Sequence, residues 1–290
     1  MEAIVAFWLC FGIFSASLTI YIVCLLASKK VFFYSSYRLF TVDLILNVSC
    51  LRNTWPTRMF LRLDTTPWFL LIIKNIPLGL HISQYLVVAF FHVQSLSTIL
   101  ICLHRLTTTV WTSSNQFWNK WYLLMYLAIL VASGLACTAT YIRYAQFTED
   151  MTRVFLIEMT PEQAYISMVG LFCFTIAYTA VIIVLGVWTI REVRKRLTAQ
   201  STEHKAMFRR LTYISIIHAI VYTSVMLWEI SRPFVSFHVT NDIICTVSDM
   251  LSFSMTYIIL MFDTNLRTIV KQLITVGNGA PIREARVTAS

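Results

Sequence analysis

The chain has 290 residues, of which 58% are hydrophobic and 13% are charged, and its formal net charge is +9. A soluble domain carries roughly 25% charged residues, so this composition excludes an ordinary soluble protein and indicates a membrane protein with several spans. With 7 Gly and 6 Pro, and apolar runs far longer than the roughly 10-residue strands of membrane barrels, the chain does not fit a β-barrel.

Seven apolar runs approach or reach the roughly 20 residues that cross a bilayer as a helix. In chain order they cover residues 3–27, 36–56, 78–103, 121–141, 164–190, 211–229 and 243–262. No linker divides them, so the sequence predicts an all-α fold, a single bundle of seven transmembrane helices. The second run is the most polar of the seven, because it contains Asp43, Asn47, Arg52 and Asn53.

Lys and Arg are unequally divided between the two sides of the predicted bundle. Sixteen lie in or beside the connections on one side and six on the other. By the positive-inside rule, the amino terminus is outside and the carboxyl terminus is cytoplasmic. This bias, together with anionic lipid, accounts for the net charge, so we expect the lipid bilayer and no nucleic acid as a partner.

The segment after the seventh run predicts a short interfacial helix over residues 263–275. Leu266, Ile269, Val270 and Leu273 recur at helical spacing, and Asp263 can cap the first turn. We expect the four apolar side chains to dip into the inner leaflet. The membrane domain is therefore predicted over residues 1–276, and residues 277–290 as a disordered cytoplasmic tail.

The third run carries more polar side chains than a lipid-facing helix tolerates. They are His92, Gln94, Ser95, Ser97 and Thr98, followed by His104 and Arg105 where the run ends. Polar groups in hydrocarbon are costly without partners, so this helix should lie inside the bundle with its polar side towards other helices or a cavity. We expect Arg105 to face water at the inner end, with Asp263 as the nearest carboxylate in depth.

Two carboxylates also lie at membrane depth. Asp43 is about 10 Å from the inner end of the second run, Asn47 is one turn further on, and Asp249 is near the middle of the seventh run. With Ser97 they form a candidate intramembrane polar network. Two interpretations are open. The network is a functional site, which binds a polar group or a cation or acts as a protonation switch, or it is a structural set of hydrogen bonds that fixes helix register.

Candidate ligand-binding side chains occupy the outer half and middle of the third and sixth runs. They are His81, Gln84, Phe91, His92, Gln94 and His218. His92 and His218 lack a third ligand at a plausible spacing, so we expect no metal. The sequence has no zinc-binding His pair, nucleophile elbow or phosphate loop, and therefore predicts neither an enzyme nor a cofactor.

Several motifs, taken in order, resemble the nematode serpentine receptor class gamma family. They are SYRLFTVDLILN at 36–47, STILICLHR at 97–105, FWNK at 117–120, SDMLSFS at 248–254 and FDTNLR at 262–267. His104 stands where the family more often has asparagine, and Thr256 where a proline is common. A related nematode class, such as class V, is the alternative.

The resemblance implies a chemosensory receptor in the plasma membrane of chemosensory cells. Such a receptor would bind a small chemical ligand from outside and engage a heterotrimeric G protein inside. Candidate coupling residues are His104, Arg105, Arg191, Arg194, Lys195, Arg196 and Asp263. A transporter or ligand-gated ion channel is the other functional class, although the chain has no internal repeat or paired broken helices of the kind transporters use.

Overall fold

The computed structural model describes residues 3–29, 32–60, 77–111, 113–138, 145–147, 154–156, 161–197 and 237–277, with isolated positions between 216 and 227. The helices are α1 (Ala3–Ser28), α2 (Ser35–Phe60), α4 (Pro77–Val110), α5 (Ser114–Thr138), α6 (Pro161–Leu197), α8 (Phe237–Phe262) and α9 (Thr264–Gly277). They confirm the predicted all-α bundle. The predicted sixth run, 211–229, lies mostly outside the described residues.

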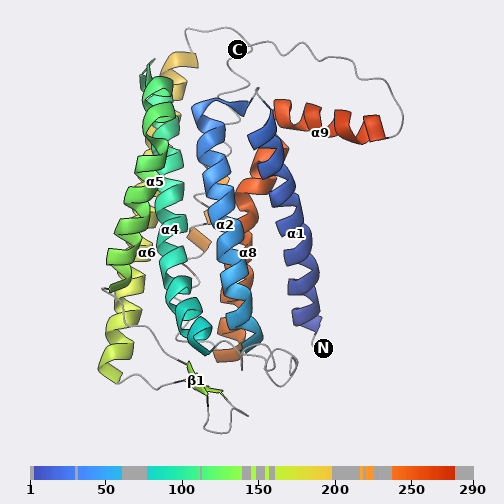
Figure 1. The fold of residues 1–290 in the computed structure, drawn as a ribbon. Helices are drawn as coiled ribbons and strands as arrows, with labels where there is room; N and C mark the ends of the chain where they lie inside the picture. The colour runs from blue at the N-terminus through green and yellow to red at the C-terminus, as the bar shows by residue number, and fades with distance from the viewer. Residues whose placement is uncertain are drawn as a thin grey trace.

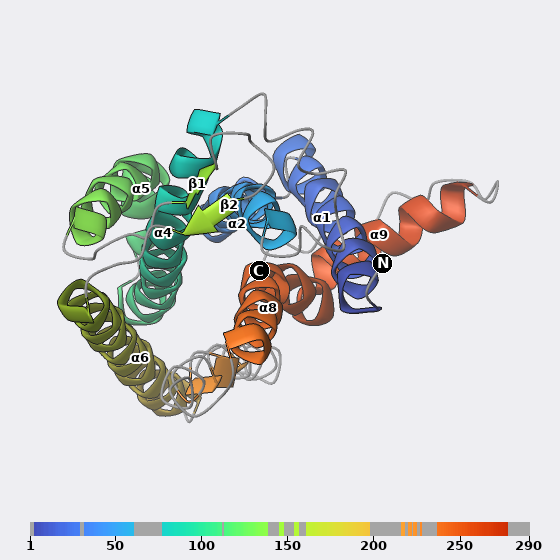
Figure 2. The same ribbon diagram turned by 90° about the horizontal axis from the view of Figure 1, so that it is seen from below.

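The long helices run side by side, and α9 turns sideways from the end of the bundle at which α1 ends and points away from the bundle (Figure 1). We call that end of the bundle the inner end, because the basic residues predict it to be cytoplasmic. Helix α4 contacts α2, α5 and α6, whereas α2 contacts α1, α4, α5 and α8. Seen along the bundle, α2 and α4 lie between α1 and α5 (Figure 2). The polar third run is therefore an internal helix, as its composition predicted.

The outward faces of the bundle are apolar. Among the described residues, four stretches are long and apolar enough to cross a membrane: Val5–Ser28, Tyr85–Val110, Ser114–Cys137 and Val169–Lys195. Large apolar side chains on α5 and α6, such as Leu127, Leu135 and Val184, are exposed. Continuous apolar surface of this extent is unusual in water and expected in lipid, so the protein is a multi-pass membrane protein.

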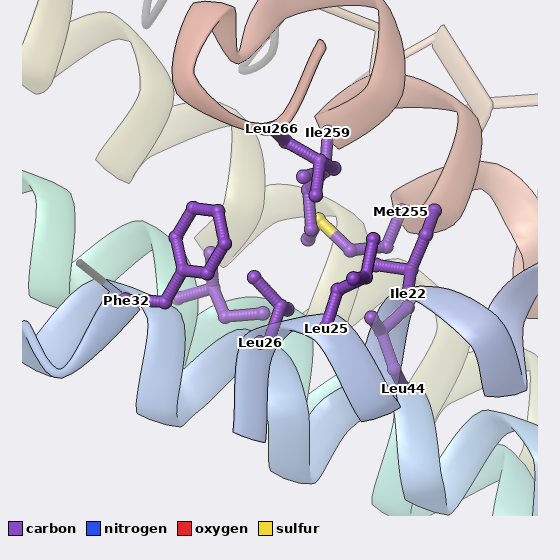
Figure 3. Close-up of a cluster of buried hydrophobic side chains, with 9 residues drawn as sticks. Ile22, Leu25, Leu26, Phe32, Leu44, Met255, Ile259 and Leu266 are labelled. Carbon is purple, nitrogen blue, oxygen red and sulfur yellow. The ribbon is translucent and has the colours of Figure 1, made fainter. Parts of the chain in front are cut away.

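An apolar cluster packs residues of α1, α2, α4, α8 and α9 against one another (Figure 3). Its buried members are Ile22, Leu25, Leu26, Phe32, Leu44, Ile101, Met255, Ile259 and Leu266. The prediction that Leu266 dips into the leaflet is wrong, because its side chain is 0% exposed and packs inside this cluster. Ile269 and Val270 are half-buried against the same cluster, while the side chain of Leu273 lies outside the described set. The first turns of α9 thus dock on the bundle.

Two short strands were not predicted. Strand β1 (Ala145–Phe147) pairs antiparallel with β2 (Val154–Leu156), with Ala145 opposite Leu156. The pair lies at the end of the bundle where α4 and α6 begin (Figure 1), and β1 contacts α4. Three-residue strands are too short to give a periodic signal in the sequence. They leave the helical class of the fold unchanged.

Candidate functional site

A buried polar network joins α2, α4 and α8 at the centre of the bundle. The Asp43 carboxylate accepts hydrogen bonds from Ser97 Oγ at 2.5 Å and from Asn47 Nδ2 at 3.0 Å. Gln94 Nε2 donates to Asn47 Oδ1 at 2.9 Å and to Ser252 Oγ at 2.8 Å. The structure thus brings together Asp43, Asn47 and Ser97, three of the four candidate network residues, and adds Gln94, which the sequence suggested as a ligand contact.

Helix α5 reaches the same network through Tyr126, which the sequence did not single out. Its hydroxyl lies 3.0 Å from Ser97 Oγ and donates to the backbone carbonyl of Leu39 at 3.1 Å. Asp249 is buried on α8, three residues before Ser252. Buried networks whose members are hydrogen-bonded fix one arrangement of helices, so these contacts support the structural alternative for Asp43.

A second polar contact joins α4 to α6 at mid-depth. His92 Nδ1 and the Tyr178 hydroxyl are 2.8 Å apart. The His92 ring is also edge-on to Phe174, at 4.8 Å between centroids, and to Phe91, at 5.3 Å. His92 and Phe91 were predicted site residues. Phe174 was missed, and its position one turn before Tyr178 was the available signal.

Arg105 differs most from its prediction. Its side chain is 3% exposed, so the expectation that it faces water is wrong. Its guanidinium carbon lies 5.9 Å from the ring centroid of Phe40. None of its side-chain nitrogens has a hydrogen-bond partner among the residues described. A permanent charge is therefore held inside the inner end of the bundle.

Asp263, expected to be the carboxylate nearest Arg105 in depth, contacts other groups, and the carboxylate that interacts electrostatically with Arg105 is Asp43. The two carboxylate oxygens of Asp263 accept hydrogen bonds from the Tyr37 hydroxyl at 2.5 Å and from the Leu266 backbone N–H at 2.8 Å. The second contact is the predicted cap of the helix after the seventh run. Asp263 thus ties the start of α2 to the junction of α8 and α9.

His104 also holds helices together. The Ser35 hydroxyl donates to Asn115 Oδ1 at 2.8 Å, so His104 Nε2, 2.9 Å from Ser35 Oγ, is the donor in their contact. The His104 ring lies edge-on to Trp118, at 5.3 Å between centroids. These contacts join α4 to the first turns of α2 and α5, and they leave His104 buried.

The remaining predicted residues divide between an exposed basic surface and undescribed side chains. Arg191, Arg194 and Lys195 are exposed at the inner end of α6. Lys195 Nζ lies 2.7 Å from Glu192 Oε1, one turn earlier on the same helix. The side chains of His81, Gln84, Arg196 and His218 lie outside the part of the chain that the structure describes.

Comparison with known proteins decides the family. The sequence model of the Srg family chemoreceptor matches residues 5–270. The chain belongs to the Srg chemoreceptor family. It is 38% identical over 281 residues to Serpentine receptor class gamma-53 of Caenorhabditis elegans, a match that covers 96% of this chain and 95% of that protein. It is 26% identical over 252 residues to Serpentine receptor class gamma-47 of the same organism, covering 83% and 81%.

Membership confirms the resemblance based on the motifs of the second, third and seventh runs. This Srg chain is a membrane receptor and not an enzyme. Its described polar contacts are hydrogen bonds between packed helices.

Proposed function

We propose that this Srg chemoreceptor binds a small chemical ligand from outside and passes the signal to a heterotrimeric G protein at its inner end. The ligand would favour one of two helix arrangements, and the inner surface of that arrangement would engage the G protein. The plasma membrane of chemosensory cells is the corresponding location.

The buried guanidinium of Arg105 is the observation that carries the proposal. A buried charge without hydrogen-bond partners is strongly destabilising, because its hydration is lost and no hydrogen bond replaces it. The Phe40 ring and the buried Asp43 carboxylate, which interacts electrostatically with Arg105, offset only part of this cost. An arrangement that brings Arg105 to backbone carbonyls or carboxylates of a partner would recover the missing hydrogen bonds. Formation of a G-protein complex would therefore favour a different position of this side chain.

Helix α4 provides the connection between the two ends. It carries His92 in its middle, Gln94 and Ser97 in the polar network, and Arg105 near its inner end. The network links α4 to α2 and α8 through hydrogen bonds. A ligand that shifts α4 relative to these helices would change the network and the burial of Arg105 together. Such a two-state element, biased from both ends, is what coupling between sites requires.

Nucleotide exchange tests the proposal directly. The purified receptor is combined with a heterotrimeric G protein, and binding of a non-hydrolysable GTP analogue is measured across a panel of odorants. At least one odorant should accelerate exchange above that of receptor alone. A ligand-evoked ion current in bilayers without G protein, and no acceleration of exchange, would contradict it and favour the channel or transporter class.

A further inference from the structure

We propose that the ligand is an uncharged small molecule with a hydrogen-bonding oxygen on an apolar body, and that it binds between α4 and α6 at His92, Ser95 and Thr179. This inference rests on the proposed function, since it names the chemical class of the ligand and the place where it binds. It concerns binding alone and needs no G protein.

Three buried polar atoms at this interface lack hydrogen-bond partners. They are His92 Nε2, Ser95 Oγ and Thr179 Oγ1, none of which has a partner among the residues that the structure describes. The three side chains are 0%, 0% and 3% exposed. Buried polar groups in native proteins are nearly always hydrogen-bonded, so three exceptions at one interface point to an absent partner.

The three atoms come from facing surfaces of two helices. Ser95 follows His92 by three residues, which places both on one face of α4. Thr179 directly follows Tyr178, whose hydroxyl is 2.8 Å from His92 Nδ1. Both helices begin at the outer end and run in the same direction (Figure 1). About one turn further inward, Ile99 of α4 packs on the cluster that contains Ile182 of α6. Ser95 and Thr179 therefore lie at the same depth.

A neighbouring threonine on α6 has a hydroxyl whose hydrogen bond is formed within the helix. Thr175 lies one turn before Thr179 and is 2% exposed. Its Oγ1 donates to the backbone carbonyl of Leu171 at 2.8 Å. A backbone carbonyl of the helix can thus accept a hydrogen bond from a buried threonine hydroxyl, whereas no such bond forms at Thr179 among the described residues. Likewise, Tyr178 occupies only the Nδ1 side of the His92 ring and leaves Nε2 available.

The chemistry of the surroundings sets the class of ligand. His92 Nε2 can donate or accept according to its tautomer, and the two hydroxyls can do either, so an alcohol or a carbonyl oxygen matches them. The rings of Phe91, Phe174 and Tyr178 have their centroids 4.8–5.9 Å from that of His92 and suit an apolar or aromatic body. These groups are uncharged. A carboxylate or ammonium would lose its hydration here without a counter-charge, which disfavours it.

Thermal unfolding of the purified full-length receptor in detergent provides the test. The probes are benzyl alcohol, acetophenone, toluene, benzoate and benzylammonium, which share a phenyl ring and differ in the polar group. We expect benzyl alcohol or acetophenone at saturating concentration to raise the Tm by about 2–4 °C. Toluene, benzoate and benzylammonium should leave it unchanged.

Matched variants assign the effect to the site. Thr179→Val removes the unpartnered hydroxyl and should abolish the shift, without lowering the Tm of the free receptor, because no described hydrogen bond is lost. Thr175→Val removes a satisfied hydroxyl one turn away and should retain the shift. If Thr179→Val fails to fold, Ser95→Ala serves in its place, with the same expected loss.

Several results would overturn the inference. An equal shift with toluene would mean simple apolar binding, and a larger one with benzoate or benzylammonium would mean a charged ligand. No shift with either oxygenated probe would mean that bound water alone satisfies the three groups. Retention of the shift in Thr179→Val would place binding elsewhere. If an odorant still stimulates nucleotide exchange in any of these cases, this site is wrong and the proposed function stands. If benzyl alcohol or acetophenone raises the Tm but no odorant stimulates exchange, the site stands and coupling to a G protein is wrong.

Discussion

At the scale of single residues, Gln94 joins three helices, which no pattern in the sequence indicated. Its side-chain amide donates to Asn47 on α2 and to Ser252 on α8, at 2.9 and 2.8 Å. Both acceptors are inside the bundle, where water does not replace a lost donor. Gln94 therefore determines how α4 sits against two neighbours.

Replacement of Gln94 by leucine should destabilise the receptor by about 1–2 kcal/mol. The substitution keeps the volume similar but leaves two buried acceptors without their donor, and side-chain hydrogen bonds within membranes contribute about 0.6 kcal/mol each on average. Thermal unfolding in detergent measures the effect. Gln116→Leu, at an exposed position of α5, is the control and should change the Tm little. Equal Tm values for the two variants would contradict the role of Gln94.

The sequence predicted which residues need partners better than which partners they have. Asp43, Asn47 and Ser97 are polar at membrane depth, and this alone predicts a network. The assignment of Gln94 and Tyr126 to it depends on how α4 and α5 rotate about their axes, which packing of many apolar side chains decides. Arg105 was misplaced for a different reason: its position near the end of an apolar run suggested water, whereas the helix continues to Val110.

At the scale of elements, the junction of α8 and α9 depends on Asp263. One oxygen caps α9 through the Leu266 N–H, and the other accepts the Tyr37 hydroxyl from α2. The capped helix then places Leu266 in the apolar cluster. The Asp263 carboxylate thus caps α9, helps to position Leu266 in the apolar cluster and links this junction to α2.

Asp263→Ala should lower the free energy of unfolding by about 1–2 kcal/mol, because both the cap and the acceptor for Tyr37 are lost. Asp263→Asn should have a much smaller effect, since the amide oxygen can still accept from the Leu266 N–H and the amide NH2 can donate to the Tyr37 oxygen. Tyr37→Phe removes the hydroxyl contact and leaves the cap, so its effect should fall between the two. Thermal unfolding of the three variants checks the order. Equal loss in the asparagine and alanine variants would show that the charge, and not the acceptor, matters.

Helix existence was predictable, and helix ends and contacts were less so. The run at 78–103 predicted α4, yet the helix extends from Pro77 to Val110. Thr107, Thr108 and Thr109 continue it, with hydroxyls that donate to carbonyls one turn earlier. The length of an apolar run predicts which residues lie within the hydrocarbon of the membrane, but it does not predict where the helix ends. The docking of Leu266 on the bundle was missed because amphipathic spacing does not distinguish lipid from protein as the apolar surroundings.

At the scale of the whole molecule, composition determined the class and the basic residues predict the orientation. The four apolar stretches and the exposed side chains of α5 and α6 agree with a multi-pass membrane protein. The central place of α4 followed from its polar content. The order of helices around it could not be deduced from one sequence, because it arises from side-chain packing across α2, α5 and α6.

The predicted orientation can be checked with tags at the two termini. A tag before Met1 should be reachable by an impermeant reagent on intact cells, and a tag after Ser290 should be protected until the cells are permeabilised. The sixteen-to-six division of Lys and Arg is the reason. Surface labelling of the carboxyl-terminal tag would show that the bundle has the opposite orientation. It would also contradict the proposed contact between Arg105 and a cytosolic protein.

Nucleotide exchange by Arg105 variants tests the central claim most directly. Wild type, Arg105→Ala and Arg105→Lys are compared at equal surface density, with the same G protein and an odorant that activates the wild type. We predict that the alanine variant reaches the surface normally but loses stimulated exchange, while lysine, which keeps the charge without the planar donor set, retains part of it. Full stimulated exchange by the alanine variant would contradict the account and leave Arg105 with a role only in packing and topology.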